Sequence, residues 1–215
     1  MYPQGINKLA KKTVTLRFDD ALASVWTEAR PRLTEYGYRT VLAVPTSQID
    51  KPSHLTLAQL RALQSFGWDV CSHSMTHPHM TGLTSEKMDI ELEGSKEWLI
   101  KHGFRKGARF FVTPYLERNE ILDAEIRKYY IPADRGAVLL APKGMSAERL
   151  NTEVDAALLL TNWITVVFHD LVSSVSGYTW EYPIAEFEKI LNHIHDQGLK
   201  VVTFSDKIGE LEKRV

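Results

Sequence analysis

The sequence predicts an α/β protein of a single domain, a distorted (β/α) barrel with seven or eight parallel strands. Short apolar runs alternate with amphipathic stretches of helical period along nearly the whole chain, which is typical of a parallel sheet covered by helices. The length of 215 residues fits one domain and leaves little room for a second. No internal repeat, low-complexity segment or linker interrupts the alternation. An open doubly wound sheet is the alternative that this pattern also permits.

In the first half of the chain, strands are predicted where β-branched and apolar residues alternate, and helices where apolar residues recur at helical spacing. The predicted strands are residues 13–18, 38–44, 68–71 and 108–112, and the predicted helices are residues 22–36, 56–66, 85–103 and 119–129. Thr56 is expected to be an N-cap, because its side chain can accept a backbone hydrogen bond. Gly37 and Gly67 follow two of these helices, where a left-handed residue is common.

The pattern loosens in the second half of the chain. Short strands at 130–133 and 137–140 are expected around a turn, followed by a helix at 146–159, a very regular strand at 163–168, a helix at 183–197 and a strand at 199–204. Pro183 suits the first turn of the last helix, where a backbone N–H has no intrahelical partner. The charged end of the chain is expected to be a solvated tail.

Composition narrows the function classes. The chain has 26 Lys and Arg against 27 Asp and Glu, so it lacks the basic surplus of a nucleic-acid binder. Its single cysteine, Cys71, cannot form an internal disulfide and is expected to fill core space. No apolar run approaches the roughly 20 residues of a membrane span. The first eight residues lack the apolar core of a secretory signal, so either the protein stays inside or a signal was removed. The compartment and the oligomeric state remain open.

Polar side chains collect at the carboxyl ends of the predicted strands. They are Asp19, Asp20, His73, His77, Tyr115 (in the pair Pro114-Tyr115), His169 and Asp170. In a parallel barrel these ends converge on one face, where barrel enzymes build their active sites. The sequence therefore predicts one site that draws on four strands.

Asp19 and Asp20 are adjacent carboxylates, and successive side chains of a strand point to opposite sides. Near a cation such a pair suits one metal ligand and one general base. The alternative is a solvated turn in which Asp20 caps the helix that follows.

His73 and His77 are four residues apart, so on one helical turn or in a tight loop both imidazoles can reach one Zn²⁺ at about 2.0–2.1 Å. A carboxylate from another strand would complete a His₂Asp set with a position left open for water or substrate. His79 lies nearby and could replace one of the pair. His169 could donate a proton to a leaving group, or it could be a core histidine bonded to a backbone carbonyl.

Together, Phe18-Asp19-Asp20, His73-Ser74-Met75-Thr76-His77, Pro114-Tyr115 and Phe168-His169 resemble the polysaccharide deacetylase family, also called the NodB-homology family or carbohydrate esterase family 4. The order and separation of the motifs match from about residue 13 to residue 204. The resemblance implies a domain at 13–207, between an N-terminal extension at 1–12 and a C-terminal tail at 208–215.

The resemblance also implies the roles of the site residues. Asp20, His73 and His77 would hold a divalent metal, usually Zn²⁺, although a His₂Asp site also accepts Co²⁺ or Ni²⁺. Asp19 would be the general base and His169 the general acid. The backbone N–H of Tyr115 would stabilise an oxyanion. Pro114, next to Tyr115, would contact the substrate.

The expected function is a metal-dependent hydrolase that removes N-acetyl groups from an N-acetylglucosamine-type glycan and releases acetate. An O-acetyl esterase acting on xylan is the nearest alternative, since the catalytic residues are shared. A carbohydrate-binding barrel without turnover is a second alternative. A hydrolase of another bond, such as a phosphodiesterase, would need more cationic residues at the strand ends.

The chain departs from the family pattern in several places. Many members have an Arg before Pro-Tyr that contacts the catalytic aspartate, and the stretch Val112-Thr113-Pro114-Tyr115 has no Arg in that place. We expect Arg135 to replace it as the partner of Asp19, with Arg109 as the alternative. Leu116 stands where a Gly usually follows the Tyr, so the shape of this loop is open. Trp180 lies in an aromatic run just beyond the last motif and could stack on a sugar ring, or it could pack against the barrel.

Overall fold

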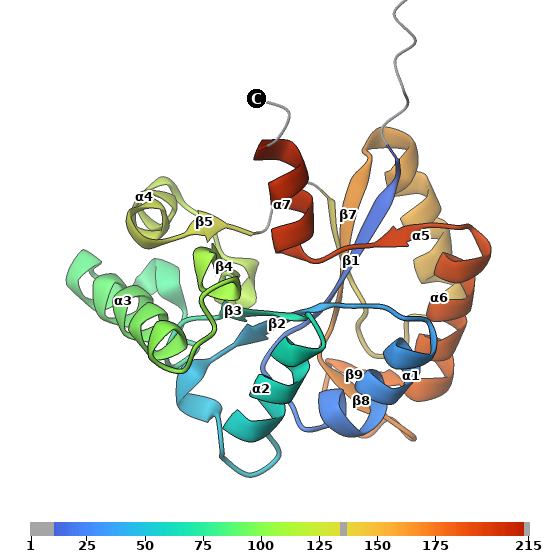
Figure 1. Cartoon of the computed structure of the whole chain (residues 1–215), viewed down its shortest axis with the longest axis horizontal. Helices are drawn as coiled ribbons and strands as arrows, with labels where there is room; N and C mark the ends of the chain where they lie inside the picture. Colours follow the sequence, from blue (N-terminus) through green and yellow to red (C-terminus); the bar gives the residue numbers. More distant parts are fainter. Residues whose placement is uncertain (1–10, 134–136, 213–215) are drawn as a thin grey trace, which may run out of the picture.

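One parallel sheet organises the molecule, as the computed structural model in Figure 1 shows for residues 11–133 and 137–212. Its eight strands are β1 (Thr13–Phe18), β2 (Val41–Val44), β3 (Asp69–Ser72), β4 (Phe110–Phe111), β5 (Ile131–Pro132), β6 (Ala137–Leu140), β7 (Trp163–Phe168) and β10 (Lys200–Val201). The order is β5-β4-β3-β2-β1-β7-β6, and β10 pairs with the start of β1. Every pair of neighbouring strands in this sheet is parallel. The sheet curls into a half-barrel, which confirms the predicted distorted (β/α) barrel of one domain.

Helices cover the outside of the sheet, with α3 and α4 on one side and α5 and α6 on the other (Figure 1). The α-helices are α1 (Arg30–Glu35), α2 (Leu57–Ser65), α3 (Ser85–Lys101), α4 (Glu120–Tyr129), α5 (Ala147–Leu160), α6 (Ile184–Asp196) and α7 (Phe204–Glu212). Thr56 caps α2 as predicted, and Gln59 returns the hydrogen bond to complete a capping box. Gly37 and Gly67 both have positive φ at the ends of their helices.

Three elements differ from the prediction. The helix expected at 22–36 is a π-helical turn (Val25–Ala29) followed by α1, because Pro31 has no N–H to bond the carbonyl four residues earlier. The strand expected at 199–204 ends at Val201, and α7 begins at Phe204 and runs across residue 208, where we expected a tail to begin. A second, two-stranded parallel sheet of β8 (Asp170–Val172) and β9 (Glu181–Pro183) was not predicted.

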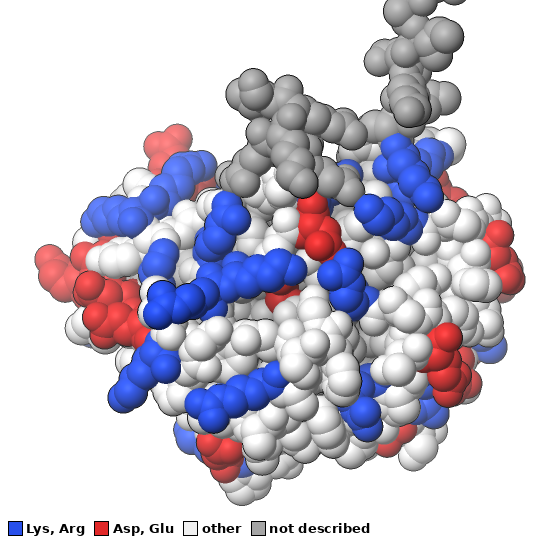
Figure 2. All heavy atoms as spheres, viewed as in Figure 1, with Lys and Arg blue, Asp and Glu red and all other residues white. Residues whose placement is uncertain are grey.

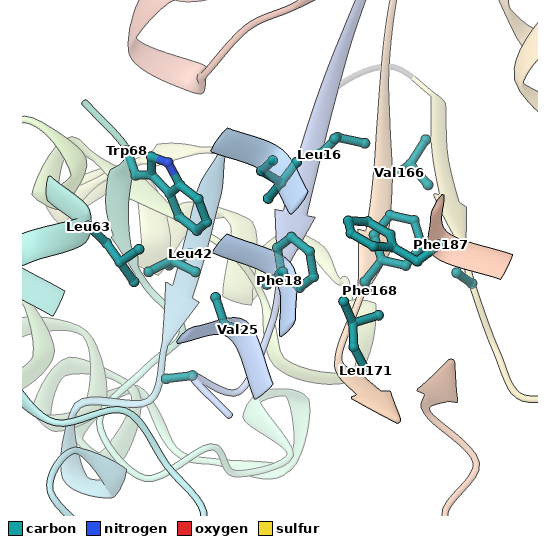
Figure 3. Close-up of a cluster of buried hydrophobic side chains, with 14 of the residues drawn as sticks. Leu16, Phe18, Val25, Leu42, Leu63, Trp68, Val166, Phe168, Leu171 and Phe187 are labelled. Carbon is teal, nitrogen blue, oxygen red and sulfur yellow. The ribbon is translucent and has the colours of Figure 1, made fainter. Parts of the chain in front are cut away.

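The main hydrophobic cluster joins the end of the central strands to the outer helices (Figure 3). Phe18 of β1, Phe168 of β7 and Phe187 of α6 are fully buried, and the two strand phenylalanines stack with ring centroids 5.6 Å apart. A second cluster on the opposite face of the sheet contains Cys71, which is buried as expected. Because β1 and β7 are buried on both faces, the residues that directly follow Phe18 and Phe168 are held rigidly.

The surface carries both signs of charge. On the face seen in Figure 2, Lys and Arg side chains lie near the centre, and Asp and Glu side chains lie mostly toward the edges. This mixture agrees with the formal charge of −1. Among the described helices, none has both the length and the apolar character needed to cross a membrane.

Candidate active site

The carboxyl ends of β1, β3, β4 and β7 open into one pocket of about 410 Å³. It is lined by Asp19, Asp20, His73, His77, Thr113, Tyr115, Leu116, Leu140, His169, Tyr178 and Trp180. Seven of the residues proposed from the sequence are among them. Pro114 is buried directly beside this lining. Arg135 lies outside the described residues.

Asp19, in the floor of the pocket, is paired with Arg17 of β1, which is not itself part of the lining. Nε of Arg17 lies 2.8 Å from Oδ1 of Asp19, and Nη2 donates to Oδ2 at 2.9 Å. Arg17 is 0% exposed and Asp19 4%, so the pair is shielded from water. Burial raises the pKa of the Asp19 carboxyl, but the positive charge of Arg17, assisted by His73 and His169, outweighs this effect and leaves the pKa below its ordinary value.

Sequence reasoning missed Arg17 as a site residue. Residues two apart on a strand project from the same face, so the distance along the chain already allowed this pair. A charged residue within a strand of apolar and β-branched residues was the signal, because a buried guanidinium requires a buried acceptor. The guanidinium of Arg109, the other candidate named above, lies over the ring of Phe110 at 5.7 Å.

Asp20, in the turn that follows β1, forms a compact cluster with His73 and His77. Nε2 of His77 lies 3.2 Å from Nε2 of His73 and 3.3 Å from Oδ1 of Asp20, and Nε2 of His73 lies 3.8 Å from the same oxygen. Ligands placed about 2.0–2.1 Å from one tetrahedral Zn²⁺ are separated by about 3.3 Å, so these spacings fit such an ion.

The protonation of this cluster also fits a cation. Nδ1 of His73 is 2.8 Å from the carbonyl oxygen of Val112, which orients the ring with its unprotonated Nε2 toward His77. Burial lowers the pKa of His73 to about 3 and also lowers the pKa of His77, so both rings are neutral near pH 7. Two imidazole lone pairs and a carboxylate that face one another are a donor set for a divalent cation. His79 lies outside this cluster.

The two histidines lie in a tight loop rather than on a helical turn. His77 has a φ of 64°, and its backbone N–H donates to the Ser74 hydroxyl at 2.9 Å. Glu91 of α3, only 8% exposed, accepts hydrogen bonds from the backbone N–H groups of Met75 and Thr76, each at 2.8 Å. It also accepts one from the Thr76 hydroxyl at 2.6 Å. Sequence reasoning missed Glu91, although a carboxylate next to the apolar residues of a buried helix face was a visible signal.

His169 follows β7 directly and enters the same pocket. Its ring stacks on Trp180 with centroids 4.9 Å apart and an interplanar angle of 26°. Its Nδ1 is buried and has no hydrogen-bond partner among the described residues. Burial lowers the pKa of His169, whereas the charges of Asp19 and Asp20 oppose this shift. The alternative of a core histidine bonded to a carbonyl is therefore not what the described residues show.

The remaining walls come from two loops. Tyr115 and Leu116, in the loop before α4, have positive φ values of 58° and 54°. Tyr178 and Trp180 lie in the loop between β8 and β9, and Glu181 braces that loop by accepting from the Ser176 hydroxyl at 2.6 Å. The pocket therefore has carboxylates and imidazoles in its floor and aromatic rings at its rim.

Comparison with known proteins agrees with this arrangement. The family model described as "Polysaccharide deacetylase" matches residues 6–133. YxkH of Bacillus subtilis (strain 168), a protein named for the same family, is 29% identical over 113 residues, which span 53% of this chain and 40% of YxkH.

Two solved structures share the fold. The first is the Xyl-CE4 domain of a multidomain xylanase from the hindgut metagenome of Trinervitermes trinervoides, with a TM-score of 0.73 and 20% identity over 94% of this chain and 92% of that one. The second is the peptidoglycan deacetylase PdaC from Bacillus subtilis, with a TM-score of 0.66 and 18% identity over 95% and 93% of the two chains. Identities this low show a common fold and leave the substrate open.

Proposed function

Because the chain belongs to the polysaccharide deacetylase family, we propose that it is a metal-dependent hydrolase that removes N-acetyl groups from an N-acetylglucosamine-type glycan and releases acetate. The observation that carries this proposal is the meeting in one pocket of a buried, charge-paired carboxylate and a separate His₂Asp cluster. Hydrolysis of an amide needs a base for water, stabilisation of an oxyanion and an acid for the leaving amine. Each requirement has a candidate among the residues of this pocket.

Asp20, His73 and His77 would hold the cation, which we propose to be Zn²⁺, with Co²⁺ or Ni²⁺ as substitutes. When bound, a divalent cation supplies a Lewis acid that polarises the acetyl carbonyl and favours deprotonation of water. The hydrogen bond between Nδ1 of His73 and the Val112 carbonyl, and the hydrogen bonds that Glu91 accepts from the loop, keep the two imidazoles in place.

Asp19 would act as the general base. Arg17 engages both carboxylate oxygens and keeps the group ionised at neutral pH, so that it can accept a proton from the attacking water. The same guanidinium fixes the orientation of the carboxylate, because a bidentate pair permits little rotation.

The backbone N–H of Tyr115 would donate to the oxyanion. In the described part of the chain no acceptor takes this N–H, and the left-handed conformation of Tyr115 distinguishes it from a regular turn. A preorganised N–H at this point stabilises charge that develops only in the transition state.

His169 would protonate the departing amine. Burial lowers its pKa, which makes the imidazolium a stronger acid, and stacking on Trp180 limits the positions that the ring can adopt. The acetate and the free amine then leave through the open mouth of the pocket.

The rim suits an uncharged sugar. Tyr115, Tyr178 and Trp180 offer ring surfaces for the apolar faces of a pyranose. Among the described residues that line the pocket, none is Lys or Arg, which disfavours a phosphate ester as the substrate.

The test is acetate release from N-acetylglucosamine oligomers by zinc-loaded protein, compared with chelated protein and with Asp19→Asn. Release that requires both the metal and Asp19 supports the proposal. Acetate release from acetylated xylan alone replaces it with the O-acetyl esterase. Glycan binding without acetate release from either substrate, and unaffected by Asp19→Asn, identifies a binding barrel.

A further inference from the structure

We infer that Glu117 is a positioning residue. It joins the loop that carries Tyr115 to the segment that follows His77, and it holds Tyr115 in its left-handed conformation. This inference rests on the proposed function for its catalytic consequence. Glu117 lies two residues after Tyr115, outside the motifs that identified the site. It would act through Tyr115 and would not touch the substrate.

The carboxylate of Glu117 uses both oxygens to bind the segment that follows His77. Oε1 lies 2.6 Å from Nδ1 of His79, and Oε2 accepts from the Thr81 backbone N–H at 3.0 Å and from the Thr81 hydroxyl at 2.7 Å. We call His79, Thr81 and Glu117 the loop clasp. It connects two loops whose residues are 36 to 38 positions apart in sequence.

The clasp also fixes the Tyr115 side chain. The ring of His79 stacks on Tyr115 with centroids 3.9 Å apart and an interplanar angle of 11°. His77 meets the same ring at 4.7 Å and 62°. Tyr115 is therefore in contact with one residue of the clasp and with one member of the His₂Asp cluster.

Such restraint is needed because the loop is strained. Tyr115 and Leu116 are consecutive residues with φ values of 58° and 54°, a region that non-glycine residues rarely occupy. Leu116 stands where the family pattern usually has Gly, which adopts this conformation without a steric penalty. A strained backbone persists only where the surrounding structure determines it, and the clasp supplies three hydrogen bonds and one ring contact for this purpose.

The consequence concerns the direction of the Tyr115 N–H. Without the clasp the loop can relax toward ordinary φ values, and the N–H would rotate away from the developing oxyanion. Binding of the sugar ring depends on several walls of the pocket, whereas the Tyr115 N–H is the one hydrogen-bond donor that we assign to the oxyanion beside the cation. Loss of the clasp should therefore lower kcat more than it raises KM.

The experiment compares Glu117→Ala, Leu116→Gly and the double variant with Glu120→Ala. Glu120 is an exposed carboxylate in the first turn of α4 and serves as the matched control. We expect Glu117→Ala to lower kcat about 10-fold to 100-fold with little change in KM or in zinc affinity. We expect the same substitution to cost much less in the Leu116→Gly background, because glycine tolerates the loop conformation unaided.

Amide hydrogen exchange of residues 116 and 117, whose N–H groups donate to the carbonyls of Thr113 and Pro114, provides a readout that needs no substrate. Faster exchange in Glu117→Ala than in Glu120→Ala supports the clasp. Unchanged exchange, an unchanged kcat, a loss that appears only in KM or zinc affinity, or equal costs in the two backgrounds would overturn it. If the unsubstituted protein releases no acetate from any glycan, the proposed function fails, and the exchange rates alone decide whether the clasp holds the loop.

Discussion

Arg17 of β1 forms a bidentate ion pair with Asp19, which directly follows the strand and lines the pocket. One short strand and the residue directly after it thus supply the charge that keeps the proposed base ionised and the base itself. β1 is buried on both faces and pairs with β2, β7 and β10, and the backbone N–H of Asp19 donates to the Phe168 carbonyl at 3.0 Å, so the sheet holds both groups in place.

Arg17→Met should remove this charge partner and leave a buried carboxylate uncompensated. We expect the free energy of unfolding at pH 7 to fall by about 3–5 kcal/mol, measured by urea denaturation. The pKa of Asp19 is lowered in the folded protein, so the ion pair stabilises the fold above about pH 4, and this contribution is lost as the pH falls through the folded pKa.

The same variant should change the pH profile of the enzyme. Without Arg17 the pKa of Asp19 rises, so the acid limb of kcat/KM should move to higher pH.

The control for the stability prediction is Arg17→Met combined with Asp19→Asn. This double variant leaves no unpaired charge and should be more stable than Arg17→Met alone. A double variant that is less stable than Arg17→Met would contradict this account.

Zinc should stabilise the protein through the His₂Asp cluster. At 100 times its dissociation constant, an ion that binds only the folded state adds about 2.7 kcal/mol, which is measurable as a rise in Tm. His77→Ala and Asp20→Ala each remove one donor and should reduce this rise strongly. His195→Ala, at an exposed position of α6, should keep it. An equal response of all three variants to zinc would mean that the ion binds elsewhere.

Glu91→Gln should weaken metal binding although Glu91 is not itself a ligand. The amide has one acceptor oxygen where the carboxylate has two, so the loop between His73 and His77 loses part of its support. We expect zinc affinity to fall about 10-fold to 100-fold, measured by competition with a chromophoric chelator. Glu97→Gln, on the exposed side of the same helix, is the control, and a similar loss in that variant would argue against a specific role for Glu91.

The loop that carries Trp180 should loosen in acid. Hydrogen bonds from the Ser176 hydroxyl and backbone N–H lower the pKa of Glu181, so the bonds are intact above its ordinary pKa and are lost as the pH falls through the lower, folded value. Amide exchange of residues 173–180, corrected for its intrinsic pH dependence, should therefore accelerate below about pH 4. Glu181→Gln should exchange faster at neutral pH and show no such acid transition. A transition that persists in this variant would assign it to another group.

Much of the fold and of the pocket could be predicted from local patterns. The strands at 13–18 and 163–168 and the cap at Thr56 are read from residue types and their spacing, and the structure has them at these positions. Asp19, Asp20 and His169 could be grouped because parallel strands bring their carboxyl ends together. The α7 helix was missed although Thr203 and Asp206 form a capping box, a pattern that was visible in the sequence.

The sequence by itself indicated most of the side chains that line the pocket, because residue type and position at a strand end are local properties. Only the tertiary structure decided what holds them. Glu91 and Glu117 each bind backbone groups of the loops beside His77 from far along the chain. Arg17 is near Asp19 in sequence, yet its need for a partner arises only when both faces of β1 are covered. Burial and long-range hydrogen bonds depend on packing, which no single segment specifies.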